Sequence, residues 1–387
     1  MARNICFFTA TRAEYGLLRW PMNEVQATAG LELSLLVSGT HLSPEFGLTY
    51  TEIEADGFVI DERVEMLLSG DTPLAVTKSL GLATIGYAEA LDRLRPDLLV
   101  LLGDRYETLA AASAATLANI PIAHLHGGET TEGAIDEAIR HAVTKMSHIH
   151  MVAAPPFAER VLQLGERPEN VHVVGAPGLD AIRRSELLGR DELGAELGGP
   201  VGDPTLLVTY HPVTLEGGGP DGAMAALLGA LDRFPDAHVI FTMPNADAHG
   251  RRIRELVEAY VAAGGHRVRA FASLGQRRYL SLAKAAAAVV GNSSSGLIEA
   301  PALHTPTVNV GRRQQGRLRG PSVLDCGERE DEIAAAIERA LSPEFQRIAA
   351  EGDSPYGDGH ASERIARHLL ETDLTNILIK RFHRYPA

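Results

Sequence analysis

The segment VVGNSSSGLIEAP (residues 289–301) joins an apolar strand to a serine-rich turn and the start of a helix. Backbone N–H groups and hydroxyls at a helix N-terminus bind anions, and a glycine there lets a phosphate approach closely. Glu299, one helical turn further on, could accept hydrogen bonds from a ribose diol. A serine cap with a first-turn glutamate, without any ligand, is the alternative. The residues expected at the phosphate are Ser293, Ser294, Ser295 and Gly296.

A second anion-binding candidate is VNVGRRQQGRLRG (residues 308–320), where four arginines follow another strand. Guanidinium groups match the paired oxygens of a diphosphate. The alternative is a solvated loop, because only four of the 36 basic residues are lysine and arginine is common throughout. The four are Arg312, Arg313, Arg317 and Arg319.

The first strand-to-helix turn, FFTATRAEYGLL, carries Arg12, Glu14 and Gly16. It lacks the G-x-G-x-x-G spacing of a dinucleotide site, so a nicotinamide cofactor is not expected. Arg12 could reach a phosphate, or it could form an exposed pair with Glu14.

Acid–base candidates follow two further strands of the first half. VLLGDRYETLAA ends in Asp104 and Arg105, a carboxylate and a guanidinium suited to proton transfer and anion binding. Asp104 could instead cap a helix, since Glu107 lies three residues later. The next segment, residues 122–142, is dense in titratable side chains: His124, His126, Glu129, Glu132, Asp136, Glu137, Arg140 and His141. No H-x-x-x-H spacing supports a metal there, and each histidine alone could be a hydrogen-bonded loop residue.

Two strand ends in the second half carry further polar residues. LLVTYHPVTLE places His211 after a strand, where it could stabilise a leaving diphosphate, act as an acid or simply bond to its turn. TMPNADAHG places Asn245 and Asp247 after the next strand, where they could contact a sugar or base, or cap a helix.

Short apolar runs alternate with amphipathic stretches along the chain, which predicts parallel α/β architecture. Strands are expected at NICFFTA, LELSLLVSG, DLLVLLG, IPIAHLHGG, HIHMVAA and VHVVGAP, then at TLLVTYHP, HVIFTMP, RVRAFAS, AAAVVGNSS and TPTVNVG. Helices are expected at 15–27, 74–95, 106–119, near Arg160, and at 223–233, 251–263, 276–284, 296–303, 331–341 and 362–370.

A Gly- and charge-rich stretch at residues 183–203 suggests a domain boundary. We expect doubly wound domains at 1–183 and 204–370, a tail at 371–387, and ligands in a cleft beyond the strand ends. The length of 387 residues fits two domains of roughly 150–200 residues each.

The net charge of −14 argues against a nucleic-acid-binding protein, because neutralising phosphates requires a basic surface. We expect no membrane span, because no apolar run reaches about 18 residues, and no signal peptide. Cys6 and Cys326 lie far apart on segments expected to be buried, which favours reduced thiols and a cytoplasmic protein.

Together these motifs resemble the hydrolysing UDP-N-acetylglucosamine 2-epimerase family of sialic-acid synthesis, over nearly the whole chain. The resemblance rests on the ordered motifs TRAEYG, SGTHLSPEFG, LLGDRYE, HLHGGETTEGAIDEAIRHAVTKMSH, HPVT, GNSSSGLIE and VNVGRRQQGR. It implies a GT-B-like fold of two Rossmann-like domains, no metal or other cofactor, and a homo-oligomer, either a dimer or a tetramer.

The resemblance also implies roles for individual residues. Ser293, Ser294 and Gly296 would bind the diphosphate and Glu299 the ribose. Asp104 and Asp136 fall on the family's catalytic carboxylate positions. Many relatives have Glu where this chain has His126, so either His126 or Glu129 could fill the third acid–base role. The residues implied at the phosphates are His211, Arg313, Arg12 and Arg105.

The implied reaction converts UDP-N-acetylglucosamine and water to N-acetylmannosamine and UDP. A base removes the C2 proton as UDP leaves C1, and hydration of the resulting 2-acetamidoglucal returns a proton to the opposite face of C2. The alternatives are the same reaction on a UDP-2,4-diacetamido-trideoxy sugar of a legionaminic-type pathway, a GT-B glycosyltransferase, and a non-catalytic UDP-sugar-binding protein. The last has no use for Asp104 and Asp136, so their presence favours an enzyme.

Overall fold

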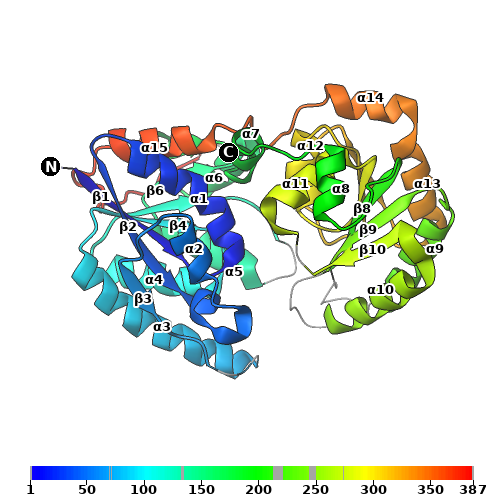
Figure 1. The fold of residues 1–387 in the computed structure, drawn as a ribbon. Coiled ribbons are helices and arrows are strands. Elements are labelled where there is room, and N and C mark those ends of the chain that lie inside the picture. The colour runs from blue at the N-terminus through cyan, green and yellow to red at the C-terminus, as the bar shows by residue number, and fades with distance from the viewer. Residues whose placement is uncertain are drawn as a thin grey trace. The chain divides into compact units, whose positions relative to one another are not determined.

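The computed structural model describes residues 2–68, 70, 72–131, 135–211, 221–243, 250–272 and 274–385. It comprises two compact units, which we describe separately. Unit 1 contains residues 1–181 and 357–387, and unit 2 contains residues 182–356 (Figure 1).

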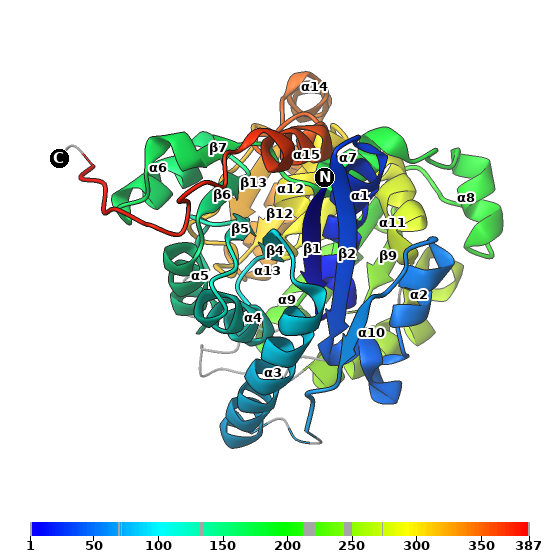
Figure 2. The same cartoon turned by 90° about the vertical axis from the view of Figure 1, so that its left-hand side faces the viewer.

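Unit 1 is built on a parallel sheet, which has seven strands among the described residues, in the order β3-β2-β1-β4-β5-β6-β7. All of these strands except β3 are labelled in Figure 2. The strands are β1 (Arg3–Thr9), β2 (Leu31–Ser38), β3 (Glu62–Val64), β4 (Leu98–Leu102), β5 (Ile122–Leu125), β6 (Ile149–Val152) and β7 (Val171–Val173). The helices are α1 (Arg12–Ala27), α2 (Tyr50–Ala55), α3 (Pro73–Leu94), α4 (Tyr106–Leu117), α5 (Ile135–Met146), α6 (Pro155–Gln163), α7 (Gly178–Arg184, at the unit boundary) and α15 (Ala361–Glu371).

Alternating side chains of β1 explain why helices cover both faces of this sheet. Ile5 and Phe7 belong to a core shared with α1 and α15, whereas Cys6 and Phe8 belong to a core shared with α3 and α4. A strand buried on both faces must be apolar throughout, which is why NICFFTA and DLLVLLG are recognisable in the sequence.

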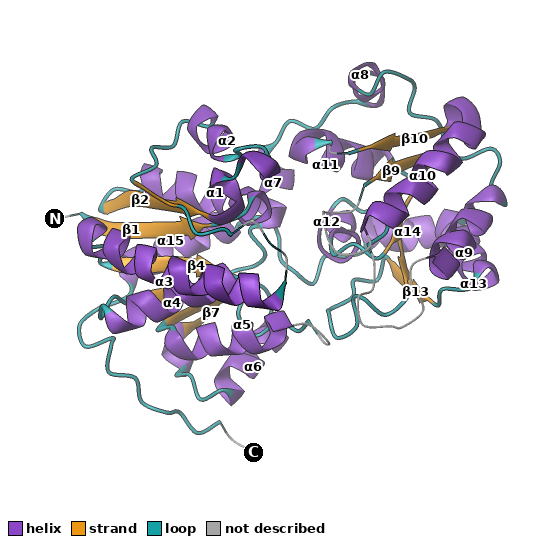
Figure 3. Cartoon of the chain, turned by 90° about the horizontal axis from the view of Figure 1, so that it is seen from below, coloured by secondary structure: helices purple, strands orange, loops and turns teal. Residues whose placement is uncertain are grey.

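Unit 2 has a parallel sheet in the order β10-β9-β8-β11-β12-β13. Its strands are β8 (Thr205–Thr209), β9 (His238–Thr242), β10 (Val268–Phe271), β11 (Ala288–Gly291), β12 (Thr307–Val310) and β13 (Val323–Cys326). Its helices are α8 (Arg190–Glu196), α9 (Asp221–Asp232), α10 (Gly250–Gly264), α11 (Gly275–Ala285), α12 (Ser295–Ala302), α13 (Glu330–Leu341) and α14 (Pro343–Glu351). Figure 3 shows strands flanked by helices in both units.

The expected fold class is confirmed: both units are parallel-sheet α/β domains, and each expected strand is present. The sequence pattern missed the edge strands β3 and β13 and the helices α2, α5, α7, α8 and α14. The edge strands are short and only partly buried, so they lack a continuous apolar run. Cys6 is buried as expected, whereas Cys326, on edge strand β13, is only half-buried. No helix among the described residues is long and apolar enough to span a bilayer.

The last helix, α15, lies within the range expected for the second domain (204–370). In the structure, residues 357–387 belong to unit 1 instead. Ile365 and Leu369 pack in the core around β1. The fully buried carboxylate of Asp180 accepts hydrogen bonds from the first backbone N–H groups of α15, those of Ala361 (2.9 Å) and Ser362 (2.6 Å). Asp180 therefore caps α15 across a gap of about 180 residues in the chain.

The turn after β1 is closed by a buried carboxylate, that of Glu14. Its Oε2 accepts from the backbone N–H groups of Ala10 (2.8 Å) and Thr11 (3.1 Å), and Thr11 caps α1 in return. Burial raises the pKa of Glu14 to about 7, although Arg105 nearby lowers it. Glu14 is therefore a structural residue, and the expected exposed pair between Arg12 and Glu14 is wrong.

Replacing Asp180 by alanine should lower the free energy of unfolding by about 1–3 kcal/mol, because two buried N–H groups lose their acceptor. Chemical denaturation monitored by circular dichroism measures the change. Asp92→Ala, on the exposed face of α3, is the control and should stay within about 0.5 kcal/mol. Equal stabilities for the two variants would contradict the capping role.

Glu14→Gln should change how stability depends on pH. Because folding raises the pKa of Glu14 from 4.5 to about 7, this group stabilises the fold fully below pH 4.5, and that stability is lost as the pH rises towards 7. Glutamine keeps the acceptor and does not titrate, so the variant should gain on the order of 3 kcal/mol relative to wild type between pH 5 and pH 8. A difference between the two proteins that is constant across this range would rule out a buried, proton-holding Glu14.

Candidate functional site

The candidate residues of unit 1 lie on loops at the carboxyl edge of its sheet. Strand β1 has β2 on one side and β4 on the other, so the winding of the chain reverses between β1 and β4. Ligands of open parallel sheets bind at this edge, beside such a reversal. Arg12 is the first residue of α1, directly after the loop that follows β1. The loop after β4 carries Asp104 and Arg105, and the loop after β5 carries residues 126–131.

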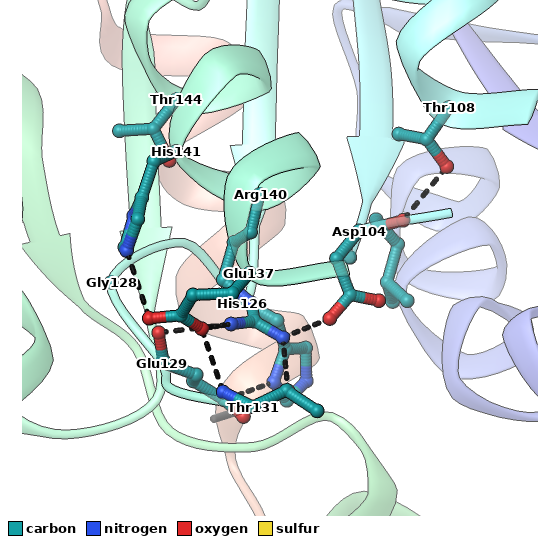
Figure 4. Close-up of polar contacts among 12 residues, drawn as sticks. Asp104, Thr108, His126, Gly128, Glu129, Thr131, Glu137, Arg140, His141 and Thr144 are labelled. Carbon is teal, nitrogen blue, oxygen red and sulfur yellow. Dashed lines mark hydrogen bonds and ion pairs between the residues drawn. The ribbon is translucent and has the colours of Figure 1, made fainter. Parts of the chain in front are cut away.

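Arg140, on α5, organises these loops from inside the protein (Figure 4). Its side chain is only 2 % exposed and donates to the Asp104 carboxylate, to Thr131 Oγ1 (2.6 Å), to Glu137 Oε2 (2.6 Å) and to the backbone carbonyl of Glu129 (3.0 Å). We call Arg140 and these four partners the Arg140 cluster. The cluster fixes the loop after β4, the loop after β5 and the start of α5 relative to one another.

Asp104 therefore forms an ion pair with Arg140 and does not cap helix α4. The residue at the N-cap of α4 is Arg105, and it makes no side-chain capping bond. The alternative reading of Asp104 as a helix cap is wrong, because the carboxylate turns instead to the buried guanidinium of Arg140.

Asp136, in the first turn of α5, lies within electrostatic reach of Asp104. Burial raises the pKa of Asp136, and the like charge of Asp104 raises it further. The structure thus brings together the two carboxylates expected to transfer protons. Two interacting carboxyl groups can supply one acid and one base in the same site.

His126 and Glu129 form a pair, so the two candidates for the third acid–base role are not independent. His126 Nδ1 lies 2.5 Å from Glu129 Oε1, and both side chains are largely buried. An ionised carboxylate at this distance favours the proton on Nδ1, which leaves the lone pair on Nε2.

His124 is a structural residue of β5. Its ring is fully buried, with Nε2 2.8 Å from the Gly103 carbonyl and Nδ1 3.2 Å from Thr144 Oγ1. Burial lowers the pKa of His124 to about 3, so the ring is neutral and Nε2–H donates to the carbonyl. It thereby supports the backbone immediately before Asp104.

The two arginines expected to bind phosphate from unit 1 have acidic partners in the structure. Arg105 donates through two nitrogens to Glu107, at 3.1 and 3.2 Å, and the Glu107 side chain is fully buried. Arg12 pairs with Glu52 on α2 at 3.2 Å, with both side chains about half exposed. Arg105 is therefore oriented by a rigid partner, whereas the Arg12 pair is open to solvent.

In unit 2, the loops after β8 and β11 are joined by Asn292. Its side chain accepts from the backbone N–H of His211 (2.6 Å) and donates to the carbonyl of the same residue (2.8 Å). Strands β8 and β11 are neighbours at the point where this sheet reverses its winding. His211 and the serine turn therefore lie side by side.

The serine turn leads into α12 as expected. Ser293 Oγ accepts weakly from the backbone N–H of Ser295 (3.4 Å), and Tyr279 donates to Ser295 Oγ (2.7 Å). Ser294 is the N-cap residue and makes no side-chain capping bond, so its hydroxyl is not used to cap the helix. Gly296 has a packing role, because a Cβ there would lie 2.8 Å from Thr307 Cγ2.

Arg313 reaches the same turn from the loop after β12, donating to the Asn292 carbonyl at 3.0 Å. Gln314 donates to that carbonyl at 2.8 Å. Arg319 instead forms an ion pair with Asp325 on β13 (3.1 Å). Of the four clustered arginines, Arg313 is thus placed at the serine turn, and Glu299 lies half-buried in α12 behind it.

Some expected residues cannot be placed: Asn245, Asp247 and Glu132 lie outside the described residues. Within the described ranges, no group of three His, Cys, Asp or Glu side chains is arranged to bind a metal ion.

The residues that sequence reasoning missed are those that position others. Arg140 and Glu137 were noted only as part of a dense segment, although Asp136 and Arg140 are four residues apart and therefore share a helix face. Asn292, Gln314 and Tyr279 carry no pattern in the sequence that separates them from ordinary polar residues.

Three comparisons relate this chain to known proteins. It is 40% identical over 381 residues, 98% of each chain, to the GDP/UDP-N,N'-diacetylbacillosamine 2-epimerase (hydrolyzing) of Campylobacter jejuni. It is 34% identical, over the full length of both chains, to the UDP-N,N'-diacetylbacillosamine 2-epimerase (hydrolyzing) of Legionella pneumophila. It is 31% identical, over 99% of each chain, to the UDP-N-acetylglucosamine 2-epimerase of Neisseria meningitidis serogroup B.

The fold is also found among solved structures. A UDP-GlcNAc 2-epimerase from Neisseria meningitidis bound to UDP-GlcNAc superimposes with a TM-score of 0.83, at 17% identity, covering 95% of this chain and all of that one. The model of the family described as UDP-N-acetylglucosamine 2-epimerase matches residues 23–370. With most of its length matched by this model and by relatives above 30% identity, the chain belongs to the UDP-N-acetylglucosamine 2-epimerase family.

Proposed function

We propose that the chain is a hydrolysing UDP-sugar 2-epimerase, which converts a UDP-2-acetamido sugar and water to UDP and the free 2-epimeric sugar. The observation that carries the proposal is the Asp104 carboxylate held by buried Arg140, with Asp136 near enough for the charge of Asp104 to raise its pKa further than burial does, because two neighbouring carboxylates can serve proton removal and return. The serine turn with Arg313 and His211 supplies the donors that a diphosphate needs.

In the first step, one group removes the C2 proton while the C1–O bond to UDP breaks. The electron pair of the C2–H bond forms the C1=C2 double bond of a 2-acetamidoglucal, and the C1–O pair leaves with UDP. The C2–H bond is weakly acidic, so stabilising the departing diphosphate must contribute to its cleavage. We assign that stabilisation to the serine turn, the start of α12 and Arg313.

In the second step, water adds to C1 and a proton adds to C2 on the face opposite to the first. Two groups on opposite faces of the sugar are required, and Asp104 and Asp136 are our assignments. The His126–Glu129 pair is the third acid–base group in this proposal. Its Nε2 would exchange a proton with the sugar or with water, while Glu129 orients the ring.

The substrate that we favour is UDP-N,N'-diacetylbacillosamine, because two relatives named for that sugar are 40% and 34% identical to this chain. UDP-N-acetylglucosamine is the second candidate, supported by the 31%-identical Neisseria relative. The reaction is the same for both, since both sugars carry a 2-acetamido group and UDP on C1.

Incubating the protein in D₂O with either UDP-sugar, without an acceptor, should release UDP and place deuterium at C2 of the product. Mass spectrometry and proton NMR of the free sugar measure the label and the C2 configuration, and the ratio of kcat/KM for the two substrates identifies the preferred one. A product protonated at C2, or turnover only after an acceptor is added, would point to a glycosyltransferase.

Asp104→Asn should reduce kcat by at least about 100-fold, because it removes a proton-transfer group while preserving the side-chain shape. UDP affinity, measured by calorimetry, should change by less than about twofold, because we assign UDP binding to unit 2. Asp92→Asn on α3 is the matched control and should retain wild-type turnover. If Asp104→Asn instead loses UDP affinity, Asp104 is a binding or structural residue.

A further inference from the structure

The C-terminal tail (residues 372–385) leaves α15 and runs past the side of unit 1 that carries α6 (Figure 2). The tail is not anchored through most of its apolar side chains: Ile379 is 64% exposed and Phe382 is 75% exposed. Its strongest contacts to the unit are made by Lys380, whose side chain is only 26% exposed.

Lys380 binds where helix α5 ends. Its ammonium group donates to the backbone carbonyls of Lys145 (2.8 Å) and Ser147, and it pairs with Glu166 Oε2 (2.8 Å). The last carbonyls of a helix have no partners within the helix, and a cation there also interacts favourably with the helix dipole. Lys380 therefore caps the C-terminus of α5.

The opposite end of α5 carries the candidate carboxylates. Asp136 lies in its first turn, and Arg140 binds Asp104 from its second turn. An α-helix rises 1.5 Å per residue, so Asp136 lies about 14 Å along the axis from Lys145. Because a helix of this length moves as a rigid rod, fixing one end restrains the other.

A second connection runs through Glu166, which is only 3% exposed. Besides Lys380, Glu166 binds Lys145 and His150 Nε2 (3.0 Å). Although burial raises it, these hydrogen bonds lower the pKa of Glu166 to about 2, so the carboxylate is ionised at neutral pH.

His150 continues this connection across the sheet towards Asp104. It lies on β6 in register with His124 on β5, and His124 binds the Gly103 carbonyl beside Asp104. Arg140 is thus linked to Lys380 directly through α5, and Asp104 is linked to it indirectly, through Gly103, His124, His150 and Glu166.

Contacts around Phe382 fix the path of the tail. The Lys145 ammonium lies 5.6 Å from the centre of the Phe382 ring, and the His383 N–H donates to the Gly165 carbonyl at 2.9 Å. Gly165 adopts φ +86°, a conformation that favours glycine, and a Cβ there would lie 2.3 Å from the Phe382 ring in its present position.

We propose that Lys380 is a positioning residue, which fastens the C-terminal tail to the end of α5 and thereby sets the geometry of Asp136 and Arg140 at the other end. The prediction for turnover rests on the proposed function. The prediction for the motion of α5 does not.

Lys380→Met tests the proposal, because it keeps the length of the side chain and removes its charge and donors. Arg381→Met is the matched control, since Arg381 is the exposed neighbouring cation. Hydrogen exchange of peptides covering residues 135–147 should be faster in Lys380→Met than in wild type or Arg381→Met. This measurement requires no substrate.

Kinetics with the UDP-sugar that the wild type turns over should show a kcat roughly 10- to 100-fold lower for Lys380→Met, because small displacements of catalytic groups are costly. UDP affinity should be unchanged, and Lys380→Arg should recover most of the kcat. A chain ending at Ile379, which lacks the ammonium and Phe382, should reproduce the kcat loss and serves if Lys380→Met does not fold.

Each outcome decides a different point. If hydrogen exchange at residues 135–147 is the same in Lys380→Met as in wild type, Lys380 does not restrain α5. If exchange is faster but kcat stays at the wild-type value, Lys380 is not a positioning residue. A lower UDP affinity, or an equal kcat loss in Arg381→Met, also overturns the positioning role. If the wild type turns over neither UDP-sugar while hydrogen exchange in Lys380→Met is faster as predicted, the proposed function is wrong and the restraint of α5 by Lys380 is supported.

Discussion

The candidate site of unit 1 depends on one buried positive charge, the guanidinium of Arg140. An unpaired charge at this depth would destabilise the fold by several kcal/mol, so its acceptors must be in place whenever the unit is folded. Those acceptors come from the loop after β4, the loop after β5 and the start of α5. Folding of the unit and positioning of Asp104 are therefore one requirement, and Asp104 is held in place without any ligand.

In the described part of unit 2, the loops after β8 and β11 are joined by an amide side chain rather than by a buried ion pair. Asn292 joins the ends of β8 and β11 through two neutral hydrogen bonds to the backbone of His211. Among the hydrogen bonds of the described residues, the first backbone N–H groups of α12 donate to oxygens of Ser293 and Ser294 and not to a carboxylate, which is compatible with the proposed anion site. A buried carboxylate at this place would compete with the diphosphate for the same N–H groups.

The sequence predicted the architecture well because strands buried on both faces must be apolar throughout, as DLLVLLG is. It missed β3 and β13, because these short edge strands are only partly buried and contain Glu62 and Asp325, which interrupt the apolar pattern. Candidate residues at strand ends, such as Asp104 and His211, could be found because the carboxyl edge of a parallel sheet is where ligands bind. The roles of individual side chains cannot be read from the same pattern, because they depend on partners distant in sequence.

Arg140 and Lys380 show why partners distant in sequence are hard to predict. Arg140 binds Asp104, which lies 36 residues earlier in the chain. This contact makes Asp104 part of an ion pair rather than a helix cap. The contact between Lys380 and α5 spans more than 230 residues. No local sequence pattern around Arg140 or Lys380 predicts these contacts. They depend on how deeply each side chain is buried and on which loops the sheet places beside it.

Substrate choice within this family must involve residues other than those assigned to the chemistry. The two candidate sugars are identical at C1 and C2 and differ at C4 and C6, so groups that transfer the C2 proton or bind the diphosphate contact the same atoms in both. Variation in the Arg140 cluster would therefore damage turnover of both sugars equally. Selection between them must come from side chains around the far edge of the ring, which can change without disturbing the ion pair that holds Asp104. On the proposed mechanism, a rigid charged cluster at the reacting carbons is thus compatible with either of the two candidate sugars.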